Sequence, residues 1–332
     1  MRIGDRPLAT FVLFGTLGAV FPVAGQPEKP NWYKGNTHTH TWESDGDSSP
    51  DDVTRWYAER DYNFLVLSDH NKQTRIEELT AKHAVAGRFM LMRGEEVTNG
   101  FEGKSIHVNG LEAKGVIGRQ TGASVFEILQ NSVDAIRRQS GVPHINHPNF
   151  QWSLTTEQLQ QVKNNKLFEV YNGHPMTNNL GGGGVSGVEA AWDAILSNGV
   201  VLYGIAVDDA HYFKQPWNRE LSLPGRGWIV VRAMRLEAAA ILEAMERGDF
   251  YASTGVVLDD VQVTKTTLTV TVRQTKFAKY RIQFIGRHGA LLHEALESPA
   301  SYTFKGTEGY VRARVLESNG QVAWVQPIVL PK

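Results

Sequence analysis

Short apolar runs and longer amphipathic segments alternate regularly through most of this 332-residue chain. Ser49 and Pro50 have the residue types of a helix N-cap and first helical position, and the apolar run 63–67 has the length of a buried strand. Such alternation favours a mostly parallel α/β fold, and six to eight units would suit a barrel. The pattern predicts further helices at 75–86, 123–139, 155–164, 188–197 and 236–247, and further strands at 88–92, 105–110, 141–146, 167–172, 200–207 and 227–231.

From about residue 256 the pattern changes to apolar and polar residues in alternation, which predicts strands and no helices. Asn319-Gly320, between the last two of these strands, is a hairpin signal. We therefore expect an α/β domain over 26–255 and a small all-β sandwich over 256–332. The glycine run 181–184 is expected to form a mobile loop without regular structure.

The first 25 residues have the layout of a secretory signal peptide. Arg2 and Arg6 precede an apolar run from Leu8 to about Phe21, and small residues stand before Gln26. The run is short for a membrane span, so we expect cleavage near Gln26 and export, to a periplasm or outside the cell, with no membrane span left. A buried N-terminal helix or an uncleaved anchor is the alternative.

Charge and cysteine content narrow the possible partners and ligands. Lys and Arg number 34 against 35 Asp and Glu, so no basic face indicates a nucleic-acid partner. The chain has no cysteine, which excludes disulfides, thiolate nucleophiles and thiolate metal ligands. A metal ion here would be held by nitrogen and oxygen atoms.

Residue types that bind metals recur where the predicted strands end. Strand ends converge at one edge of a parallel barrel, so distant residues can meet in a single cleft there. In extended chain, residues i and i+2 point to the same side, so His38 with His40, or Asp209 with His211, can aim two ligands into one pocket. Either pair alone is more often an ordinary polar pair; the recurrence favours a metal site. The recurring residues are His38, His40, Asp45, Asp69, His70, Glu95, Glu96, His107, His147, Asp209 and His211.

Six motifs in order resemble the PHP (polymerase and histidinol phosphatase) family of metal-dependent hydrolases: "NTHTHTWESDG", "FLVLSDHN", "GEEVT", "HVNG", "NHPN" and "GIAVDDAH". The sequence of residues 32–71 is most similar to an exported branch of this family, which includes carbamate and aryl-ester hydrolases of the carbaryl-hydrolase type. The resemblance covers about residues 31–255. It implies a distorted (β/α)7 barrel with two or three divalent ions, Zn, Mn or Fe, at its C-terminal edge.

The resemblance also implies a ligand set. The family's Gly-x-Glu and Asp-x-His patterns select Glu96 over Glu95 and Asp209 over Asp208. Asp45, His70 and His211 would additionally act in catalysis. One ion would be held by His38, His40, Glu96 and Asp209, a second by His107 and His147 with Glu96 bridging, and a third by Asp45, His70 and His211.

Each of the other polar residues near the motifs has two possible roles. Asn71, Lys72 and His174 are candidate substrate contacts, although Lys72 has the character of a solvated surface residue and His174 could serve loop packing. Asp69 is expected to cap the loop or to orient a histidine. His144 is expected in the core or behind a ligand, and Glu169 and Asn172 could orient ligands or simply pack.

Three functions are compatible with these features. The first is hydrolysis of a phosphoester, a phosphomonoester or a nucleotide-like molecule, by a hydroxide that bridges two ions. The second is hydrolysis of a carbamate or aryl ester, favoured by the scarcity of basic residues near the motifs. The third is a non-catalytic, metal-stabilised binding module, against which the complete ligand set argues. The first two imply a small-molecule ester as the partner.

Overall fold

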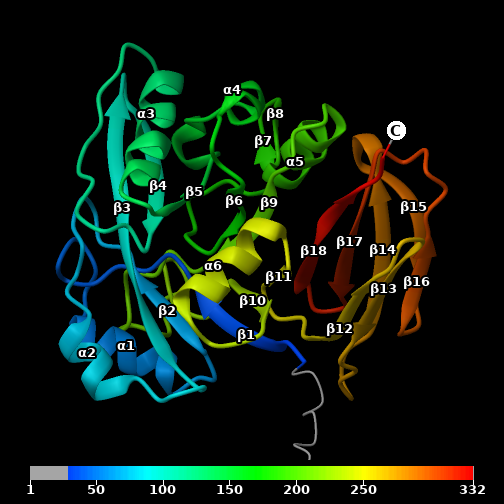
Figure 1. Ribbon diagram of the computed structural model, residues 1–332, viewed down its shortest axis with the longest axis horizontal. Helices are drawn as coiled ribbons and strands as arrows, with labels where there is room; N and C mark the ends of the chain where they lie inside the picture. The colour runs from blue at the N-terminus through cyan, green and yellow to red at the C-terminus, as the bar shows by residue number, and fades with distance from the viewer. Residues whose placement is uncertain (1–28, 332) are drawn as a thin grey trace, which may run out of the picture.

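The computed structural model describes residues 29–331, which form an α/β part and an all-β part side by side (Figure 1). The predicted signal peptide at 1–25 lies outside the described residues. Within 29–331, none of the helices combines the length and apolar character needed to cross a membrane.

Seven strands of the α/β part are hydrogen-bonded in a fixed order. β1, β2 and β3 are parallel, as are β5, β6 and β9, whereas β4 is antiparallel to both its neighbours. A parallel bridge between Thr39 and Ala210 joins the residues just after β1 to those just after β9, so the order curves back on itself there. The strands are β1 (Asn31–Asn36), β2 (Phe64–Leu67), β3 (Met90–Phe101), β4 (Lys104–Leu111), β5 (Val142–Ile145), β6 (Leu167–Asn172) and β9 (Tyr203–Val207).

The expectation of a mostly parallel alternation is wrong in two places. β3 continues nine residues beyond its predicted end and turns at Glu102 and Gly103, both at positive φ, into antiparallel β4. A two-residue connection cannot hold a crossover helix, so only an antiparallel hairpin is possible. The predicted strand 227–231 corresponds to β10 (Trp228–Ala233), which pairs antiparallel with both β1 and β11 (Phe250–Ser253).

The predicted helices are confirmed, and side-chain caps fix where several of them begin. Ser49 accepts a hydrogen bond from the Asp52 N–H, and Thr155 forms a capping box with Gln158. Gly248, at φ 79°, ends the last helix in the left-handed conformation that glycine tolerates best. The helices are α1 (Pro50–Ala58), α2 (Glu77–His83), α3 (Val125–Arg138), α4 (Thr156–Gln161), α5 (Val188–Ser197) and α6 (Ala238–Arg247), with a 3₁₀ turn η1 (Phe150–Trp152) after β5.

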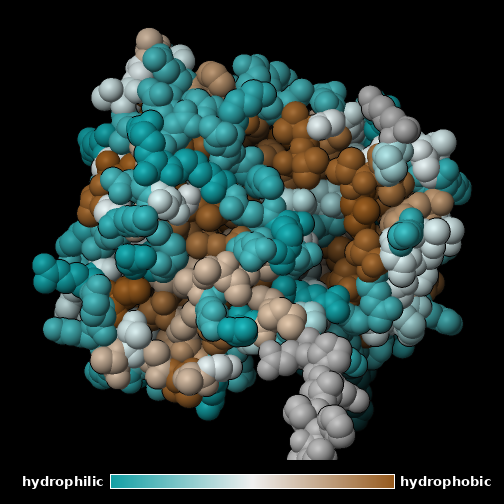
Figure 2. Space-filling model, viewed as in Figure 1, coloured by the Kyte–Doolittle hydropathy of each residue, from teal (hydrophilic) through white to brown (hydrophobic). Residues whose placement is uncertain are grey.

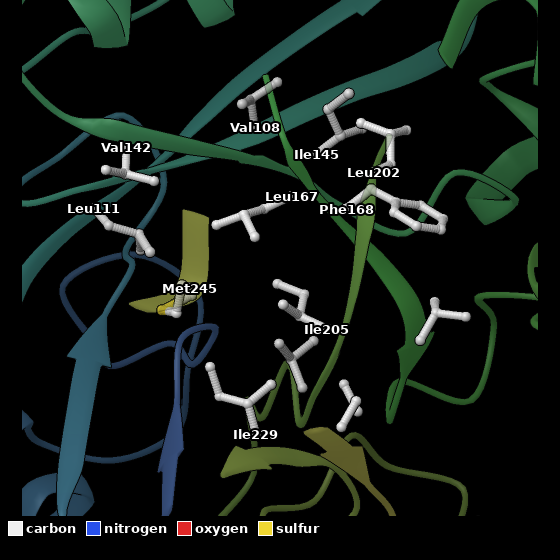
Figure 3. Packing of buried hydrophobic residues seen from close by; sticks show 14 of the residues in the cluster. Val108, Leu111, Val142, Ile145, Leu167, Phe168, Leu202, Ile205, Ile229 and Met245 are labelled. Atoms are coloured by element: carbon white, nitrogen blue, oxygen red, sulfur yellow. The ribbon is translucent and has the colours of Figure 1, made fainter. Parts of the chain in front are cut away.

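The largest apolar core lies within the α/β part and is built from strands that also carry the polar motifs (Figure 3). Val108 from β4, Ile145 from β5, Phe168 from β6 and Ile205 from β9 are fully buried in it, and Met245 of α6 belongs to the same core. Burying each such side chain stabilises the fold by about 1.5–3 kcal/mol. The ends of these strands, where the polar motifs lie, are therefore held in place by a well-packed core.

The all-β part consists of two sheets around a shared core. Val270 and Tyr302 from one sheet and Phe284 and Val315 from the other are buried together. β18 also pairs with β11, so one of these sheets continues the large sheet of the α/β part. One sheet contains β12 (Leu258–Val263), β13 (Thr267–Val272) and β16 (Ala300–Thr303); the other contains β14 (Tyr280–Gly286), β15 (Ala290–Ala295), β17 (Tyr310–Glu317) and β18 (Val322–Val329).

Two local features differ from the sequence expectations. The glycine run forms a small hairpin, β7 (Gly181–Gly182) with β8 (Val185–Ser186), in which each glycine of the run has positive φ. β15 differs from the alternation expected after residue 256, because it lies at the edge of its sheet with no fully buried residue and has no alternating pattern. On the face in Figure 2, apolar residues gather in the band between the two parts.

Candidate metal centre

The structure brings all nine predicted metal ligands together at the edge where β1 and β9 meet. Four overlapping groups of three or four of these side chains have ligand atoms within 4.8 Å of one another. Seven of the nine line a cavity of about 140 Å³, together with Phe150 and His174. The four groups are His40, Asp45, His70 and His211; His38, His147 and Asp209; His38, His40 and Glu96; and His70, Glu96 and His107.

One set of side chains has the spacing of a metal's coordination shell. The Nε2 atoms of His38 and His40 lie 3.2 Å apart, and each lies 3.2 Å from Asp209 Oδ1. Glu96 contributes Oε1 at 3.3 Å from His38 Nε2 and Oε2 at 3.5 Å from His40 Nε2. Ligands about 2.0–2.1 Å from a tetrahedral ion are about 3.4 Å from each other, so these four residues fit one divalent ion.

A second group lies at the more open side of the cavity. Asp45 Oδ2 is 3.3 Å from His70 Nε2, and Asp45 Oδ1 is 3.4 Å from His211 Nε2. The Asp45 side chain is 52% exposed and that of His70 is 25% exposed, whereas those of His38 and His40 are fully buried. A cation bound by this group would therefore be the one closest to an incoming substrate.

Glu96 lies at the centre of the cluster. Its Oε1 accepts hydrogen bonds from Asn146 at 2.7 Å and faces His107 Nδ1 at 2.9 Å and His147 Nε2 at 3.4 Å. Its Oε2 is buried and lies 2.8 Å from His70 Nδ1 and 3.5 Å from His40 Nε2. A buried carboxylate surrounded by imidazole nitrogens needs positive charge beside it, which a bound divalent cation would supply in place of the histidine protons, so the residues present fit bound metal.

His107 and His147 do not fall in the same group of ligand atoms, although both meet Glu96 Oε1. Their ring centroids are 5.0 Å apart in an edge-on arrangement. The grouping of atoms joins His107 to His70 and joins His147 to His38. The Glu96 carboxylate reaches both histidines. Two neighbouring ions could therefore share Glu96 whether His107 and His147 serve the same ion or different ions.

Hydrogen bonds to the far nitrogen of each ring orient three of the histidines. Glu169 Oε1 lies 2.6 Å from His38 Nδ1, and Thr98 Oγ1 lies 2.5 Å from His70 Nδ1. The backbone carbonyl of Asp209 lies 2.9 Å from His211 Nδ1. With Nδ1 engaged in this way, each ring presents Nε2 to the cluster, as metal-binding histidines do.

Opposing charges set the protonation of the cluster. Burial by itself would lower the pKa of His38, but the charges of Asp209, Glu96 and Glu169 outweigh burial and raise this pKa well above its usual value. In the other direction, the charges of nearby histidines, His38 among them, hold the pKa of Glu96 and of Asp209 well below their usual range in spite of burial. Burial and the neighbouring charge of His211 lower the pKa of His40 to about 4.

The neighbouring carboxylates Glu95 and Asp208 point away from the cluster. Glu95 accepts the backbone N–H groups of Ile117 and Gly118, each at 2.7 Å. Asp208 accepts the hydroxyl of Tyr57 at 2.8 Å and the backbone N–H of Gly227 at 2.9 Å. Glu96 and Asp209 are thus the members of each pair that the backbone directs into the cavity.

The candidate substrate contacts have different surroundings. Asn71 bonds both the N–H and the carbonyl of Thr98 through its amide, so its polar atoms are used within the loop. Lys72 forms an ion pair with Glu43 at the surface. Only His174 of the three lines the metal cavity, with its ring 5.8 Å from that of His211.

Supporting residues surround the ligands on the inner side. Asp69 accepts hydrogen bonds from Thr41 and Ser44 in the loop after His40, and so shapes that loop. His144 is fully buried, and its Nε2 lies 3.4 Å from the carbonyl of Thr37.

Two supporting residues, Thr98 and Asn146, were not singled out from the sequence. Thr98 stands two residues after Glu96 in extended chain, so the spacing places both on one side and was an available signal. No sequence feature indicated a supporting role for Asn146 except its place in the motif "NHPN".

Comparisons with solved structures place the fold among known ones. A two-domain protein from Bacteroides vulgatus, described as containing a PHP-like metal-dependent phosphoesterase, aligns with a TM-score of 0.51 and 16% identity over 87% of this chain and 92% of its own. The chain therefore has the same overall fold, both parts included. A metal-dependent phosphoesterase from Bifidobacterium adolescentis (TM-score 0.40, 13% identity, 55% and 89% covered) and an amidohydrolase from Chromobacterium violaceum with bound sulfate (0.39, 15%, 55% and 88%) are weaker matches. No family model and no curated protein matches the sequence.

Proposed function

We propose that this chain is a metal-dependent hydrolase of the PHP family that cleaves phosphoesters, either phosphomonoesters or nucleotide-like molecules. The observation that carries the proposal is the convergence of eight candidate nitrogen and oxygen ligands around a ninth, the buried carboxylate of Glu96. The six ordered motifs support the family, and the ring of seven strands supports a distorted (β/α)7 barrel.

The proposed ligand sets follow the sequence motifs. His38, His40, Glu96 and Asp209 would hold one ion, His107, His147 and Glu96 a second, and Asp45, His70 and His211 a third. This donor set suits Zn, Mn or Fe. Bound divalent ions would supply a water of lowered pKa and positive charge beside the charge that develops on the ester.

The chain's own residues would orient the ester and move protons. Asp45, His70 and His211 lie at the exposed side of the cavity, where a substrate enters. Asp45 meets the Nε2 atoms of both histidines, so either imidazole could pass a proton to a leaving oxygen at that position when no third ion occupies these nitrogens. His38 and Asp209, more deeply buried, keep the inner side of the cavity rigid through Glu169 and Asn172.

A carbamate or aryl ester is the second candidate substrate, and one observation favours it. The residues that line the metal cavity include no Lys or Arg within the part of the chain that the structure describes. The nearby Lys72 is engaged by Glu43. A neutral ester would need no such cation, whereas a phosphate would depend on the ions alone for charge neutralisation.

The experiment that separates the candidates is a hydrolase screen with protein loaded separately with Zn, Mn and Fe. Phosphomonoesters, nucleotides, aryl carbamates and aryl acetates are compared on each preparation. Phosphoester cleavage with little carbamate cleavage supports the first candidate. Cleavage of carbamates or aryl esters alone overturns it in favour of the second.

Three further features belong to the proposal. Residues 1–25 would act as a signal peptide that exports the enzyme to a periplasm or outside the cell. Residues 256–332 would form a β-sandwich domain attached to the barrel. The partner would be a small-molecule ester, with no nucleic-acid surface.

A further inference from the structure

A second, larger cavity of about 880 Å³ lies between the α/β part and the all-β part. His174 lines both this cavity and the metal cavity, so the two meet at that residue. Its walls come from the end of β6, from the segment 219–226 and from the hairpin 319–322 that joins β17 to β18. A molecule held at the metal centre can thus extend past His174 toward the all-β part.

Aromatic rings form one wall of the second cavity. Tyr171 and Trp324 line it and are stacked, with ring centroids 5.9 Å apart and an angle of 28° between their planes. Trp324 comes from β18, so the all-β part completes this wall. Tyr171 is partly exposed and Trp324 is buried behind it, so the pair gives this side of the cavity an apolar wall against which a planar ring can pack.

The same cavity also contains two arginines that form no ion pair within residues 29–331. Within that range the guanidinium of Arg226 donates hydrogen bonds only to the backbone carbonyls of Gly173 and Arg219, at 2.9 and 2.8 Å. Arg219 is exposed and donates none from its side chain within that range. Glu189 also lines the cavity, but Arg312 and Arg314 already pair with it. The cavity therefore has positive charge available for an anion.

The position of Arg226 is fixed close to the metal centre. A Cβ atom on Gly173 would lie 2.7 Å from Arg226 Cβ, so only glycine permits this approach. The backbone N–H of Arg226 also bonds Asp208, the residue next to the ligand Asp209. The guanidinium of Arg226 therefore lies in the cavity wall beside residue 173, and His174 is the next residue of that wall.

We propose that this second cavity is the specificity pocket of the enzyme and binds a planar ring that carries an anionic group remote from the scissile ester. The ring would lie against Tyr171 and Trp324, and the remote anion would face Arg219 and Arg226. His174 would stand at the threshold: its Nδ1 accepts the N–H of Met176 at 3.2 Å, which leaves Nε2 to donate a hydrogen bond to the ester oxygen that joins ring and scissile group. The inference rests on the proposed ester hydrolysis and adds the substrate class.

The test compares phenyl phosphate with its 3- and 4-carboxyphenyl analogues on metal-loaded protein. We expect kcat/KM to be on the order of tenfold higher for a carboxylated ester, because an arginine–carboxylate contact forms only there. Arg219→Gln and Arg226→Gln should each lower the ratio of carboxyphenyl to phenyl phosphate cleavage to near one. Arg219→Gln is the cleaner variant, since its side chain supports no backbone carbonyl. Arg235→Gln, an exposed arginine outside both cavities, is the matched control.

Equal cleavage of all three esters, unaffected by either variant, would overturn the pocket while leaving ester hydrolysis intact. If no ester is cleaved, the hydrolase proposal fails instead, and the pocket is then judged by calorimetric binding of 3- and 4-hydroxybenzoate against phenol. Tighter binding of a hydroxybenzoate that Arg219→Gln weakens supports the pocket. Equal binding of hydroxybenzoates and phenol, or none, overturns it.

Discussion

Glu95 and Glu96 are adjacent acidic residues with opposite surroundings. Glu96 faces five histidines, and the charges of His107, His38 and His70 hold its pKa well below the usual range despite burial. Glu95 meets only backbone N–H groups on the other side of β3, and burial raises its pKa. Successive residues in a strand point to opposite faces, so one residue of register separates the candidate metal ligand Glu96 from the supporting residue Glu95.

Substitution of each glutamate by glutamine tests that register. Glu96→Gln should lower metal content to a small fraction of wild type, because its carboxylate is common to several ligand groups. Glu95→Gln should keep the metal and lower the free energy of unfolding by about 1–2 kcal/mol, through weakened bonds to Ile117 and Gly118. Elemental analysis and urea denaturation measure the two effects. The reverse pattern, with metal lost only in Glu95→Gln, would show that the register is off by one residue.

Metal affinity should depend on pH through the protonated histidines. Burial would lower the pKa of His70, but the charges of Glu96 and Asp45 raise it to about 10, above the usual 6.5. The raised pKa stabilises the metal-free fold below about pH 6.5, and this contribution is lost as pH rises toward 10. A metal ion must displace that proton, so affinity should increase about tenfold per pH unit for each proton released.

Calorimetric titration at pH 6, 7 and 8, in buffers of different ionisation enthalpy, measures affinity and proton release together. The expected result is tighter binding at higher pH with protons released to the buffer. Affinity that stays constant or falls over this range would contradict the charge arrangement around His70.

At the level of single residues, motifs and spacing predicted the positions of the ligands better than their supports. The i, i+2 pattern anticipates that His38 and His40 approach one point, and the structure brings their Nε2 atoms to 3.2 Å. Whether they ligate metal stays a prediction. Asn146 and Thr98 act through bonds between separate strands, and such contacts leave little pattern in a single segment.

α5 connects the two parts of the molecule through a buried ion pair. Asp193 on α5 accepts two hydrogen bonds from Arg312 on β17, both at 2.7 Å, and a third from Tyr310. The Arg312 side chain is 1% exposed. Burial would lower the pKa of Arg312, but Asp193 and Glu189 raise it, so the guanidinium stays charged inside the protein.

Asp193→Ala should therefore lower the free energy of unfolding by about 3 kcal/mol, because a buried charge loses its main partner. Glu189, 2.8 Å from Arg312, limits the loss. The double variant Asp193→Leu with Arg312→Met should recover most of the stability, since it leaves no unpaired charge. Urea denaturation gives both values. A change below about 0.5 kcal/mol in Asp193→Ala would mean that the pair contributes little.

Elements with local signals were predicted, and elements that depend on distant partners were not. Caps such as Ser49 and Ser124 mark helix starts within a few residues of chain. The orientation of β10 depends instead on its pairing with β1, about 200 residues earlier, which local periodicity does not encode. The edge strand β15 lacks the buried face that would have produced an alternating pattern.

On the scale of the whole molecule, the two parts are joined more closely than the change in sequence pattern suggests. β18 pairs with β11, and Gln326 bonds both the N–H and the carbonyl of Gly204 in β9. The change near residue 256 marks a change of secondary structure, but the hydrogen-bonded sheet continues across it. The sequence pattern predicted two parts, but it contains no signal for the pairing of strands between them.

That arrangement places the metal centre in the α/β part and the larger cavity at the junction with the all-β part. We propose that the nine-residue cluster binds divalent ions and that bound ions drive ester hydrolysis. The most direct measurement follows one sample of protein, purified without chelator, through elemental analysis, phosphoester hydrolysis, removal of metal and its return. Two or three ions per chain are expected, with activity lost on removal, restored on return and absent in folded Asp209→Asn. Hydrolysis that persists in metal-free protein, or in folded Asp209→Asn at the wild-type rate, would contradict the claim.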